Sequence, residues 1–575
     1  MTRPLARTAA VLALLAYLPA LTAAPGRMPS DSKLYLYLDP GRFISDAAST
    51  FDGRQFAGWV PHQHIAYLWP SAPWFWVFDQ FGVPDWIAHR LWIGSIMLAA
   101  GLGVRWCARL LGLGPIAAFA AAVTYQLSLY VLPYVSRTSV MLLPWAGLGW
   151  IVALTIRATR RRTWADPAAI ALVVLTVGAV NATALAMIVP APAWWLVHAA
   201  WRRSIAWRDA AIVALRVGAL SLAVSAWWIA MLVIQGRFGT DVLPFSESLA
   251  DVSLTATSSE AWRGLGYWLF YVRDPYAATT TESLRYLSSS SAIAVSYALQ
   301  LAGLGALAWC RWTHRRFAAG LIGIGLVLAV GVHPIDDRSP LMTLLAGDDD
   351  GGLALALRSS TRALPVMMLG LALALAMAVE AGRGVALARW RVPASWALGF
   401  AVALVAVVNL PALWTGAFVD PALERDQTPP GSWLAAADAL DATGDAGRVL
   451  QLPGSEFGAF RWGFTVDQPL PGLTDKPLVT RDLLPLGSGP AMDLLYAFDD
   501  RIQDGVLEPE AVAPISRLLG VDTIWLTNDL AFERFRVARP DVVRDLVIDA
   551  PGTGEVSGYG EPSLHAAEVP MIDER

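Results

Sequence analysis

The chain has 575 residues, of which 55% are hydrophobic and only 16% are charged, and its formal net charge is −4. Soluble domains average about a quarter charged residues. Here the apolar residues gather in runs of about 18 or more, the length that crosses a hydrocarbon core of roughly 30 Å. The composition excludes an ordinary soluble protein and predicts membrane insertion. No concentrated basic face occurs outside the short loops between apolar segments, so we expect no nucleic-acid partner.

Eleven apolar segments are candidate membrane spans. In chain order they cover residues 6–24, 87–104, 113–133, 140–156, 167–185, 186–200, 210–234, 291–309, 317–333, 363–380 and 395–415. The division at residue 186 rests on Pro190 and Pro192, which interrupt an otherwise continuous apolar run. One long kinked helix over 167–200 is the alternative.

Arginines mark every second short loop. They are Arg105 and Arg109 after the second segment, Arg157 and Arg160 to Arg162 after the fourth, Arg202, Arg203 and Arg208 after the sixth, Arg311, Arg315 and Arg316 after the eighth, and Arg383, Arg389 and Arg391 after the tenth. Lys and Arg stay on the cytoplasmic side of a membrane. We therefore expect a multi-pass protein of the plasma membrane with a cytoplasmic N-terminus. The first segment should stay as an anchor, because Pro25 would directly follow a signal-peptide cleavage site.

The fold class that follows is an α-helical polytopic membrane protein with a C-terminal external α/β domain. The transmembrane module should cover residues 1–416, with external loops at 25–86, 235–290 and 334–362, and the external domain should cover 417–575. Within that domain, 431–441 and 508–519 have helical patterns. Arg448–Leu452 and Thr523–Leu526 have the pattern of buried strands.

The first external loop carries two aspartates, Asp31 and Asp39, close to cations and aromatic residues. A carboxylate at the depth of lipid headgroups is suitably placed to remove a proton from a sugar hydroxyl. A helix cap or a solvated surface position is the ordinary alternative for either residue. The loop continues through His62-Gln63-His64, Tyr67 and Trp69. The two histidines have no obvious third ligand, so we predict no metal site, and the aromatic residues fit an interfacial belt or a platform for sugar rings.

Later in the chain, Arg358 and Arg362 precede the tenth apolar segment at the outer side of the membrane, against the usual charge bias. Residues four apart share a face of a helix, and arginine binds phosphate in a bidentate manner. We expect the pair to bind a phosphate group or to anchor the chain at lipid headgroups. Asn181 falls inside the fifth apolar segment, where it should form a hydrogen bond between helices.

Several short motifs occur together in one order. They are Ser30-Asp31-Ser32-Lys33-Leu34, Asp39-Pro40-Gly41-Arg42-Phe43, Gln63 with Tyr67-Leu68-Trp69-Pro70, Arg90-Leu91-Trp92, Gly178 to Thr183, Leu357 to Arg362, Leu452 to Ser455, and Thr527 to Leu530. As an ordered set they resemble the actinobacterial α-(1→3)-arabinofuranosyltransferases of cell-wall arabinan synthesis, over most of the chain. Members of that family are often far longer, so the resemblance identifies this chain as a short or truncated member.

The resemblance implies a GT-C membrane glycosyltransferase that takes arabinofuranose from a polyprenyl-phosphate donor and gives it to an arabinan or other polysaccharide acceptor. It assigns the catalytic base to Asp31, with Asp39 in reserve. Cations should hold the leaving phosphate: Lys33, Arg358 and Arg362. The sugar and acceptor should contact His62, Gln63, His64, Tyr67 and Trp69. One base without a covalent partner implies inversion.

No cofactor beyond the lipid-linked donor is expected, the need for a divalent metal is left open, and other cell-wall assembly proteins are expected partners. Two alternatives stay open: a GT-C transferase of another lipid-linked sugar such as mannose, and a non-catalytic lipid-linked glycan transporter or assembly protein.

Overall fold

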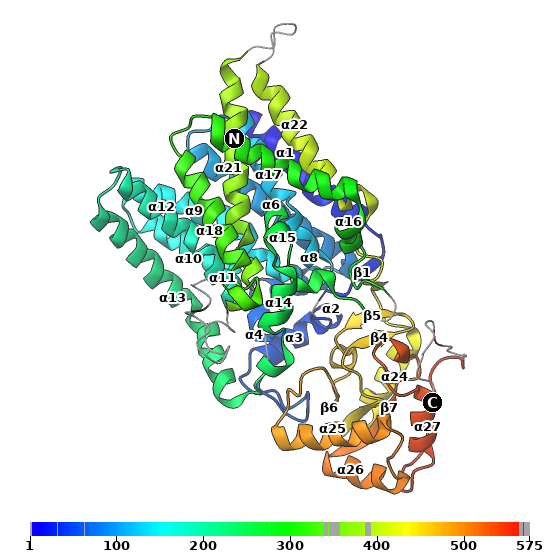
Figure 1. The fold of residues 1–575 in the computed structure, drawn as a ribbon. Coiled ribbons are helices and arrows are strands. Elements are labelled where there is room, and N and C mark those ends of the chain that lie inside the picture. The colour runs from blue at the N-terminus through cyan, green and yellow to red at the C-terminus, as the bar shows by residue number, and fades with distance from the viewer. Residues whose placement is uncertain are drawn as a thin grey trace.

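The computed structural model describes residues 3–31, 33–61, 64–274, 277–338, 343, 357–385, 393–444, 446–562 and 567. Most of these residues form a bundle of long helices (Figure 1). The longest are α1 (Arg3–Thr22), α6 (Asp85–Leu110), α7 (Pro115–Gln126), α9 (Leu143–Arg161), α10 (Ala165–Val177), α12 (Pro190–Trp201), α13 (Trp207–Phe238), α17 (Ser290–Trp309), α18 (Arg315–Val330), α21 (Leu364–Ala381) and α22 (Ala394–Asn409). Each predicted apolar segment therefore contains a helix.

Seven helical stretches of the described chain are long and apolar enough to cross a membrane. They are Asp85–Leu110, Pro115–Val135, Ser139–Arg161, Ala182–Trp201, Trp207–Phe238, Ser290–Trp309 and Ser360–Gly384. Shorter apolar helices cover Ala6–Thr22, Ala165–Val177 and Ala394–Asn409. The chain is thus built as a multi-pass membrane protein, while the count of eleven crossings stays a prediction.

The predicted division at residue 186 is wrong. Helix α10 ends at Val177, and α11 (Ala182–Ile188) begins after a break at Gly178–Asn181. The Asn181 side chain caps α11 by accepting a hydrogen bond of 2.7 Å from the Ala184 N–H. Pro190 falls in the first turn of α12, where the missing N–H costs little, so α11 and α12 together form one apolar helical stretch.

Two helices lie at the centre of the bundle. Helix α6 packs against α1, α7 and α9, and α21 packs against α7, α17, α18 and α22. Small residues allow the close approach: a Cβ at Gly325 or at Gly370 would lie within 3.0 Å of the facing backbone of α21 or α18. The long helix α13 lies at the edge of the bundle, and only 17% of its apolar 18-residue segment is buried.

Short helices form the connections at one end of the bundle. They are α2 (Tyr35–Leu38), α3 (Pro40–Ala47), α4 (His64–Tyr67), α5 (Ser71–Gln80), α8 (Leu132–Val135), α14 (Leu249–Thr255), α15 (Ser258–Arg263), α16 (Glu282–Ser288) and α23 (Ala412–Thr415), with single 3₁₀ turns at Leu129–Val131, Ser139–Leu142, Leu243–Phe245, Trp268–Tyr271, Ile335–Asp337 and Ser360–Ala363. A further 3₁₀ turn, Gly382–Gly384, follows α21 at the other end of the bundle. The first connection, residues 23–84, leads directly into α6.

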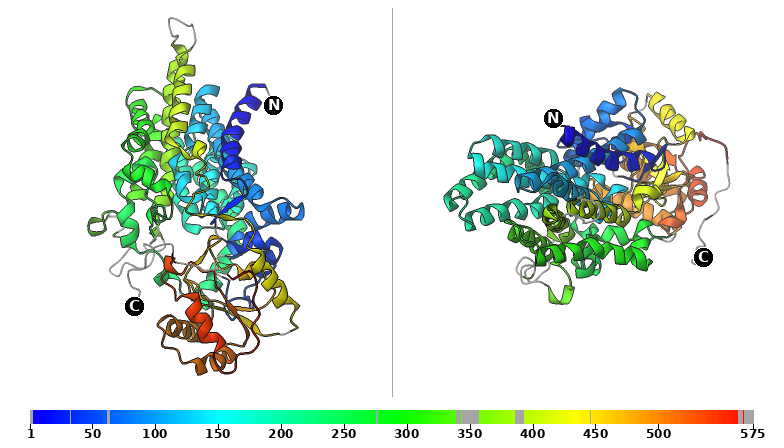
Figure 2. Two further views of the ribbon diagram at one scale, coloured as in Figure 1. Left: turned by 90° about the vertical axis from the view of Figure 1, so that its right-hand side faces the viewer. Right: turned by 90° about the horizontal axis from the view of Figure 1, so that it is seen from above.

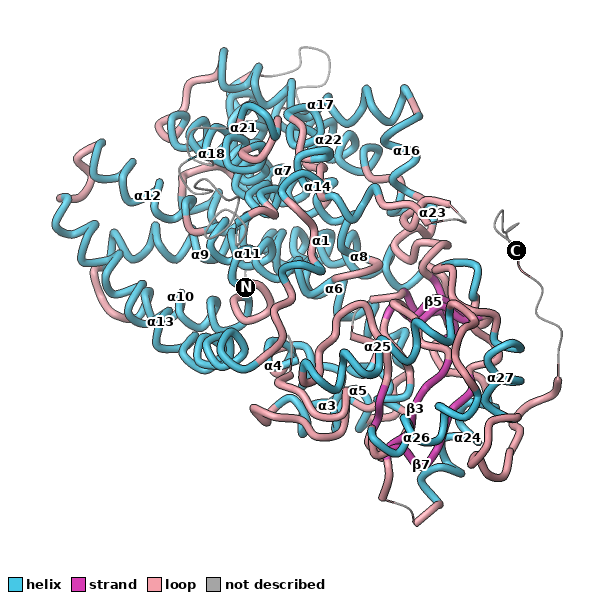
Figure 3. Tube along the Cα trace, turned by 60° about the horizontal axis from the view of Figure 1, so that its bottom comes forward, coloured by secondary structure: helices cyan, strands magenta, loops and turns pink. Residues whose placement is uncertain are grey.

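Residues 417–575, here called the C-terminal part, lie beyond one end of the bundle, and the N-terminus lies at the opposite end (Figure 2). The helices of this part are α24 (Gly431–Ala442), α25 (Gly489–Gln503), α26 (Val512–Leu518) and α27 (Pro540–Ile548), with 3₁₀ turns at Leu470–Gly472, Pro509–Ala511 and Phe532–Arg534. Its parallel sheet has the order β6-β3-β7, with β6 at Leu478–Val479, β3 at Arg448–Leu452 and β7 at Val521–Leu526 (Figure 3). The predicted helices and both predicted strands are confirmed.

A second sheet joins the C-terminal part to the first connection. Its order is β1-β2-β5-β4, with β1 at Arg27–Pro29, β2 at Glu424–Asp426, β5 at Gly463–Val466 and β4 at Gly458–Phe460. Strand β1 pairs antiparallel with β2 and directly precedes Asp31. This pairing was not predicted, because nothing in a three-residue strand identifies a partner so far along the chain.

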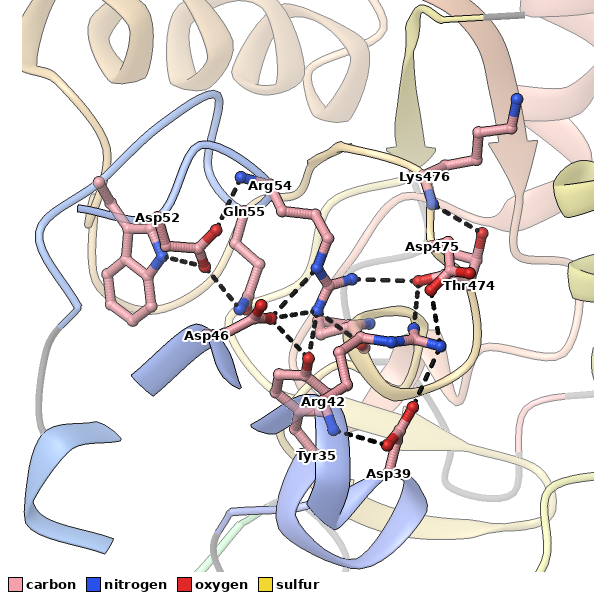
Figure 4. Close-up of polar contacts among 12 residues, drawn as sticks. Tyr35, Asp39, Arg42, Asp46, Asp52, Arg54, Gln55, Thr474, Asp475 and Lys476 are labelled. Carbon is pink, nitrogen blue, oxygen red and sulfur yellow. Dashed lines mark hydrogen bonds and ion pairs between the residues drawn. The ribbon is translucent and has the colours of Figure 1, made fainter. Parts of the chain in front are cut away.

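Polar contacts extend this junction (Figure 4). The Arg54 guanidinium donates hydrogen bonds to the Asp46 carboxylate at 2.8 Å and to the backbone carbonyls of Pro471 and Thr474 at 2.9 and 3.0 Å. Arg42 donates to the same Thr474 carbonyl at 2.7 Å and pairs with Asp475 at 2.8 Å. The first connection is therefore held firmly against the C-terminal part.

Candidate active site

Asp31 lies at the base of the first connection, just after β1. The preceding Ser30 donates from its N–H to the Leu423 carbonyl at 2.7 Å, so the chain enters Asp31 from a fixed direction. Asp31 itself is buried, with 1% of its surface exposed. A buried carboxylate costs free energy unless hydrogen bonds compensate for the lost water, so its partners define the site.

The partners of Asp31 come from two helical stretches of the bundle. The Ser139 N–H donates to Oδ1 at 2.9 Å, and the Ser139 hydroxyl donates a very short hydrogen bond to Oδ2. His89 on α6 places Nε2 3.1 Å from Oδ2. The indole N–H of Trp92 in turn donates to the Ser139 hydroxyl at 3.1 Å. These contacts fix the orientation of the Asp31 carboxylate at the end of the bundle where the short connecting helices lie.

The contact between Arg90 and His89 decides which ring nitrogen of His89 carries a proton. Arg90 Nη1 lies 2.9 Å from His89 Nδ1, and a guanidinium can only donate. Nδ1 therefore accepts, and the proton of the neutral ring sits on Nε2, from which it is donated to Asp31. Arg90 is fixed by a second hydrogen bond of 2.8 Å to the Arg27 carbonyl. Arginine, histidine and aspartate thus form an ordered chain.

Tyr37 completes the surroundings of the carboxylate. Its hydroxyl is a hydrogen-bond partner of Asp31, and burial together with the negative charge of Asp31 raises the pKa of Tyr37 well above its usual range. The phenol therefore stays protonated and donates. An ionised carboxylate offers about four lone-pair sites. Ser139, His89 and Tyr37 fill them, so a substrate hydroxyl can reach Asp31 only by replacing one of these donors.

Two other charged residues of the first connection have local structural contacts. Asp39 is the N-cap of α3, accepting from the Arg42 N–H at 2.9 Å and pairing with the Arg42 guanidinium at 3.1 Å. Lys33 lies 3.6 Å from Asp467 of the C-terminal part. Burial lowers the pKa of Lys33, but the interactions with Asp467, Tyr67 and Asp482 together outweigh burial, and the net shift is upward. Asp39 thus has the capping role that the sequence left open, and the Lys33 charge is already paired.

The two predicted phosphate-binding arginines do not share a helix. Arg358 precedes the 3₁₀ turn Ser360–Ala363, and Arg362 lies within it. Arg358 Nε lies 3.5 Å from Glu247, to which Ser359 also donates a hydrogen bond at 2.7 Å. Arg362 donates to the Asn181 side chain at 3.1 Å, which confirms the predicted interhelical hydrogen bond of Asn181.

A further arginine, Arg137, lies beside the Asp31 site. It precedes Ser139 by two residues and donates to the Thr279 hydroxyl at 2.9 Å, and burial lowers its pKa to about 10. Tyr267 interacts electrostatically with both Arg137 and Arg362. In the part of the chain that the structure describes, neither arginine forms an ion pair with a carboxylate. Both arginines therefore bring positive charge close to Tyr267, with Asp274 and Glu247 nearby as acidic groups.

The predicted sugar-binding residues differ in their exposure to solvent. His62 and Gln63 lie outside the described residues. His64 and Tyr67 are buried, and the His64 ring packs 4.9 Å from Phe43 and 5.1 Å from Trp59. Trp69 is 42% exposed, with its indole N–H 3.4 Å from the Thr176 hydroxyl. Among these described residues, Trp69 presents the most surface to a ligand.

Sequence reasoning missed His89, Ser139 and Arg137. His89 directly precedes the Arg90-Leu91-Trp92 motif, and Arg137 is an isolated cation in the short loop between the third and fourth apolar segments. The available signal was a set of polar residues at the ends of apolar segments on the side expected to face outward. In the described residues no cluster of three or more His, Cys, Asp or Glu could hold a metal ion.

The profile of one protein family, described as alpha-(1->3)-arabinofuranosyltransferase, N-terminal GT-C domain, matches residues 15–574. The chain belongs to this family. It is 31% identical to the alpha-(1->3)-arabinofuranosyltransferase of Mycolicibacterium smegmatis over 569 residues, covering 94% of this chain and 38% of that protein. The Mycobacterium tuberculosis protein of the same name is 29% identical over 577 residues, with coverages of 94% and 39%.

The solved arabinofuranosyltransferase AftD from mycobacteria has the same fold, with a TM-score of 0.78 at 27% identity over 98% of this chain and 38% of that one. The resemblance drawn from the ordered motifs is confirmed, and the helical architecture is that of a GT-C protein. The chain spans less than two fifths of the length of these members of the α-(1→3)-arabinofuranosyltransferase family.

Proposed function

We propose that this chain is a membrane glycosyltransferase that transfers arabinofuranose from a polyprenyl-phosphate donor to an arabinan acceptor, with Asp31 as the base. The observation that carries the proposal is the ordered Arg90–His89–Asp31 chain at the head of an arabinofuranosyltransferase-family bundle. A carboxylate fixed by surrounding donors is held for one reaction geometry, and precise positioning supplies much of an enzyme's rate gain.

Positive charge near the carboxylate fits the chemistry of the donor. The leaving group is a lipid phosphate, which is a stable anion and needs cations more than it needs an acid. Arg137 and Arg362 are the best candidates to bind it, because they lack carboxylate partners among the described residues. Lys33 and Arg358 already pair with Asp467 and Glu247, so we assign them to shaping the site.

The reaction then proceeds by single displacement. The acceptor hydroxyl takes the place of the Tyr37 hydroxyl beside Asp31 and passes its proton to the carboxylate. Its oxygen forms a bond to the anomeric carbon while the bond from that carbon to the phosphate oxygen breaks, and the polyprenyl phosphate leaves with the electron pair. Attack opposite the leaving group inverts the anomeric configuration.

The proposed setting is the outer face of the plasma membrane. Arginine-rich loops at the other end of the bundle support a cytoplasmic assignment for that end, with eleven crossings and a cytoplasmic N-terminus. The first connection, the arginines Arg137 and Arg362, and the C-terminal part would then face outward, where a lipid-linked donor and a cell-wall polysaccharide meet.

The test is a transfer assay with purified protein, polyprenyl-phosphate arabinofuranose and a synthetic arabinan acceptor. We expect Asp31→Asn to lower kcat by about 10²–10⁴-fold, the usual worth of a general base. Asp209→Asn is the matched control, since Asp209 pairs with Arg162 at 3.1 Å in an arginine-rich loop. NMR of the product should show inversion at the anomeric carbon.

Transfer by Asp31→Asn at the wild-type rate would exclude Asp31 as the base. Loss of activity in Asp39→Asn alone would move the role to the reserve residue. Wild-type protein that uses another lipid-linked sugar, such as mannose, in place of arabinofuranose would refute the donor assignment. Thermal unfolding of each variant separates loss of chemistry from loss of fold.

A further inference from the structure

A second candidate binding site lies far from Asp31, where the connection between α12 and α13 meets the connection between α17 and α18. It is a cavity of about 500 Å³. Four arginines and two tryptophans dominate its lining: Arg202, Arg311, Arg315, Arg316, Trp201 and Trp312. No acidic residue lines it.

The fold holds the two connections together. The Arg202 guanidinium donates a hydrogen bond of 2.7 Å to the Thr313 carbonyl, and the His198 and His314 rings approach each other with nitrogens 3.4 Å apart. Burial and the neighbouring charges lower the pKa of His314 to about 4, so at neutral pH this ring carries no charge. The positive charge of the cavity therefore comes from its arginines, which are exposed.

These arginines differ from others in the loops of the bundle. Arg157 pairs with Asp166 at 2.5 Å, Arg162 with Asp209 at 3.1 Å and Arg383 with Glu380 at 3.2 Å. Within the described ranges, no carboxylate forms an ion pair with any of the four cavity arginines. A concave site with uncompensated positive charge attracts anions more strongly than an isolated exposed arginine does.

The placement separates this cavity from the candidate active site. The helical stretch Ala182–Trp201 begins next to Asn181, which contacts Arg362, and ends at the cavity, about 30 Å away at 1.5 Å per residue. Helix α18 likewise begins at the cavity and ends near Ser360, whose hydroxyl donates to the Ala329 carbonyl at 2.7 Å. The cavity is therefore at the opposite end of the bundle from the proposed donor phosphate.

The side chains around the cavity are of the kinds found at a membrane–water interface. Trp201 and Trp309 end α12 and α17 and are 57% and 85% exposed, which suits indole rings at the headgroup level. The Arg316 guanidinium lies over the Trp201 ring at 5.4 Å, which holds that side chain in place. Arginine forks match the geometry of phosphate oxygens.

We propose that this cavity binds the phosphodiester headgroup of an anionic membrane lipid, in the leaflet opposite to the candidate active site. The arginines supply the hydrogen bonds to the phosphate, and the tryptophans at the helix ends contact the adjoining glycerol and upper acyl chains. Because the proposal depends on neither Asp31 nor the sugar, it stands apart from the proposed transfer reaction.

Native mass spectrometry of the purified chain with phosphatidylglycerol tests the proposal, with neutral phosphatidylcholine as the comparison lipid. We expect wild-type protein to retain phosphatidylglycerol, and Arg311→Gln/Arg315→Gln to bind it at least about tenfold more weakly. Arg161→Gln/Arg208→Gln removes the same charge from exposed positions outside the cavity and should bind like wild type.

A measurement on wild-type protein alone complements the variants: phosphatidylglycerol should raise Tm more than phosphatidylcholine does. Equal binding of the two lipids, or equal loss in both double variants, would overturn the proposal. Inorganic phosphate is the third ligand. If it binds as tightly as phosphatidylglycerol and excludes it, the cavity takes free phosphate and the lipid assignment fails.

Discussion

Single side chains of the Asp31 site are fixed by contacts that the neighbouring sequence does not reveal. His89 follows Asp31 by 58 positions and Ser139 by 108, yet both donate to the same carboxylate. Each is an ordinary residue near the end of an apolar segment. Their role follows only from the packing of the first connection onto α6 and the Ser139–Arg161 stretch.

His89 should act as a positioning residue for Asp31. We expect His89→Ala to lower kcat in the transfer assay by about 10–100-fold with little change in KM, because a second partner that orients a reacting group has an effect of about this size. His89→Gln should recover part of the rate, since its amide can still donate to Asp31. A KM increase that accounts for the whole loss, with no recovery by glutamine, would contradict the positioning role.

Asp482 should make the stability of the protein depend on pH. Burial and the neighbouring Asp467 raise the pKa of Asp482 from its ordinary value of about 4 to about 7. Between these two values the native protein keeps a proton that the unfolded chain has released. Stability should therefore fall as pH rises from about 4 to about 7, by at most about 4 kcal/mol, and stay lower above that.

Asp482→Asn should remove this loss. We expect the variant to raise Tm at pH 8 by more than it does at pH 5, as measured by thermal unfolding in detergent. Asp493→Asn, at an exposed position of α25, is the control and should change Tm little at either pH. An equal effect of Asp482→Asn at the two pH values would show that its carboxyl group is ionised throughout.

Whole elements were predictable where hydropathy alone decides them. Each apolar segment became a helix because a backbone in lipid must satisfy its hydrogen bonds internally. The break near residue 180 was not predictable from hydropathy, because it depends on the Asn181 side chain, which caps α11. The prolines that suggested a break at residue 186 lie in the first turn of α12, where they do not interrupt the helix. The short helices α2 to α5 were also missed, because tertiary contacts stabilise elements of this length.

The break between α10 and α11 is connected to Arg362 through Asn181. Asn181 caps α11 and accepts from Arg362, so a carboxylate there would keep the cap and neutralise the arginine. We expect Asn181→Asp to raise KM for the lipid-linked donor by about tenfold or more while Tm is retained. Asn181→Ser also preserves a cap without adding charge, and it should leave KM much closer to wild type. Equal KM values for the two variants would argue against phosphate binding by Arg362.

At the scale of the whole molecule, the first connection and the C-terminal part form one continuous structure. Strand β1 completes a sheet with β2, and Arg54 ties Asp46 and Tyr35 to the carbonyls at 471 and 474 (Figure 4). The membrane-spanning pattern and the α/β pattern were each recognisable in the sequence. The junction between them was not, because it depends on backbone carbonyls and on one short strand.

Arg54→Gln should loosen this junction. Arg54 is 14% exposed and its removal leaves Asp46 without its cation, so we expect a loss of about 2–4 kcal/mol, visible as a lower Tm and faster cleavage by endoproteinase Asp-N before Asp475. Arg544→Gln is the matched control, because Arg544 pairs only at the surface with its neighbour Asp545. Unchanged proteolysis in Arg54→Gln would show that the two parts stay docked without this contact.

The pairing of β1 with β2 also determines when the Asp31 site can form during synthesis. Ser30 and its partner Leu423 are 393 residues apart, so Asp31 cannot take its final position until the ribosome has made the rest of the bundle. At about 5–20 residues per second this delay is roughly 20–80 s. The nascent helices therefore enter the membrane well before Asp31, the proposed base, reaches its final position, and on that proposal an incomplete chain has no assembled site to act on the lipids around it.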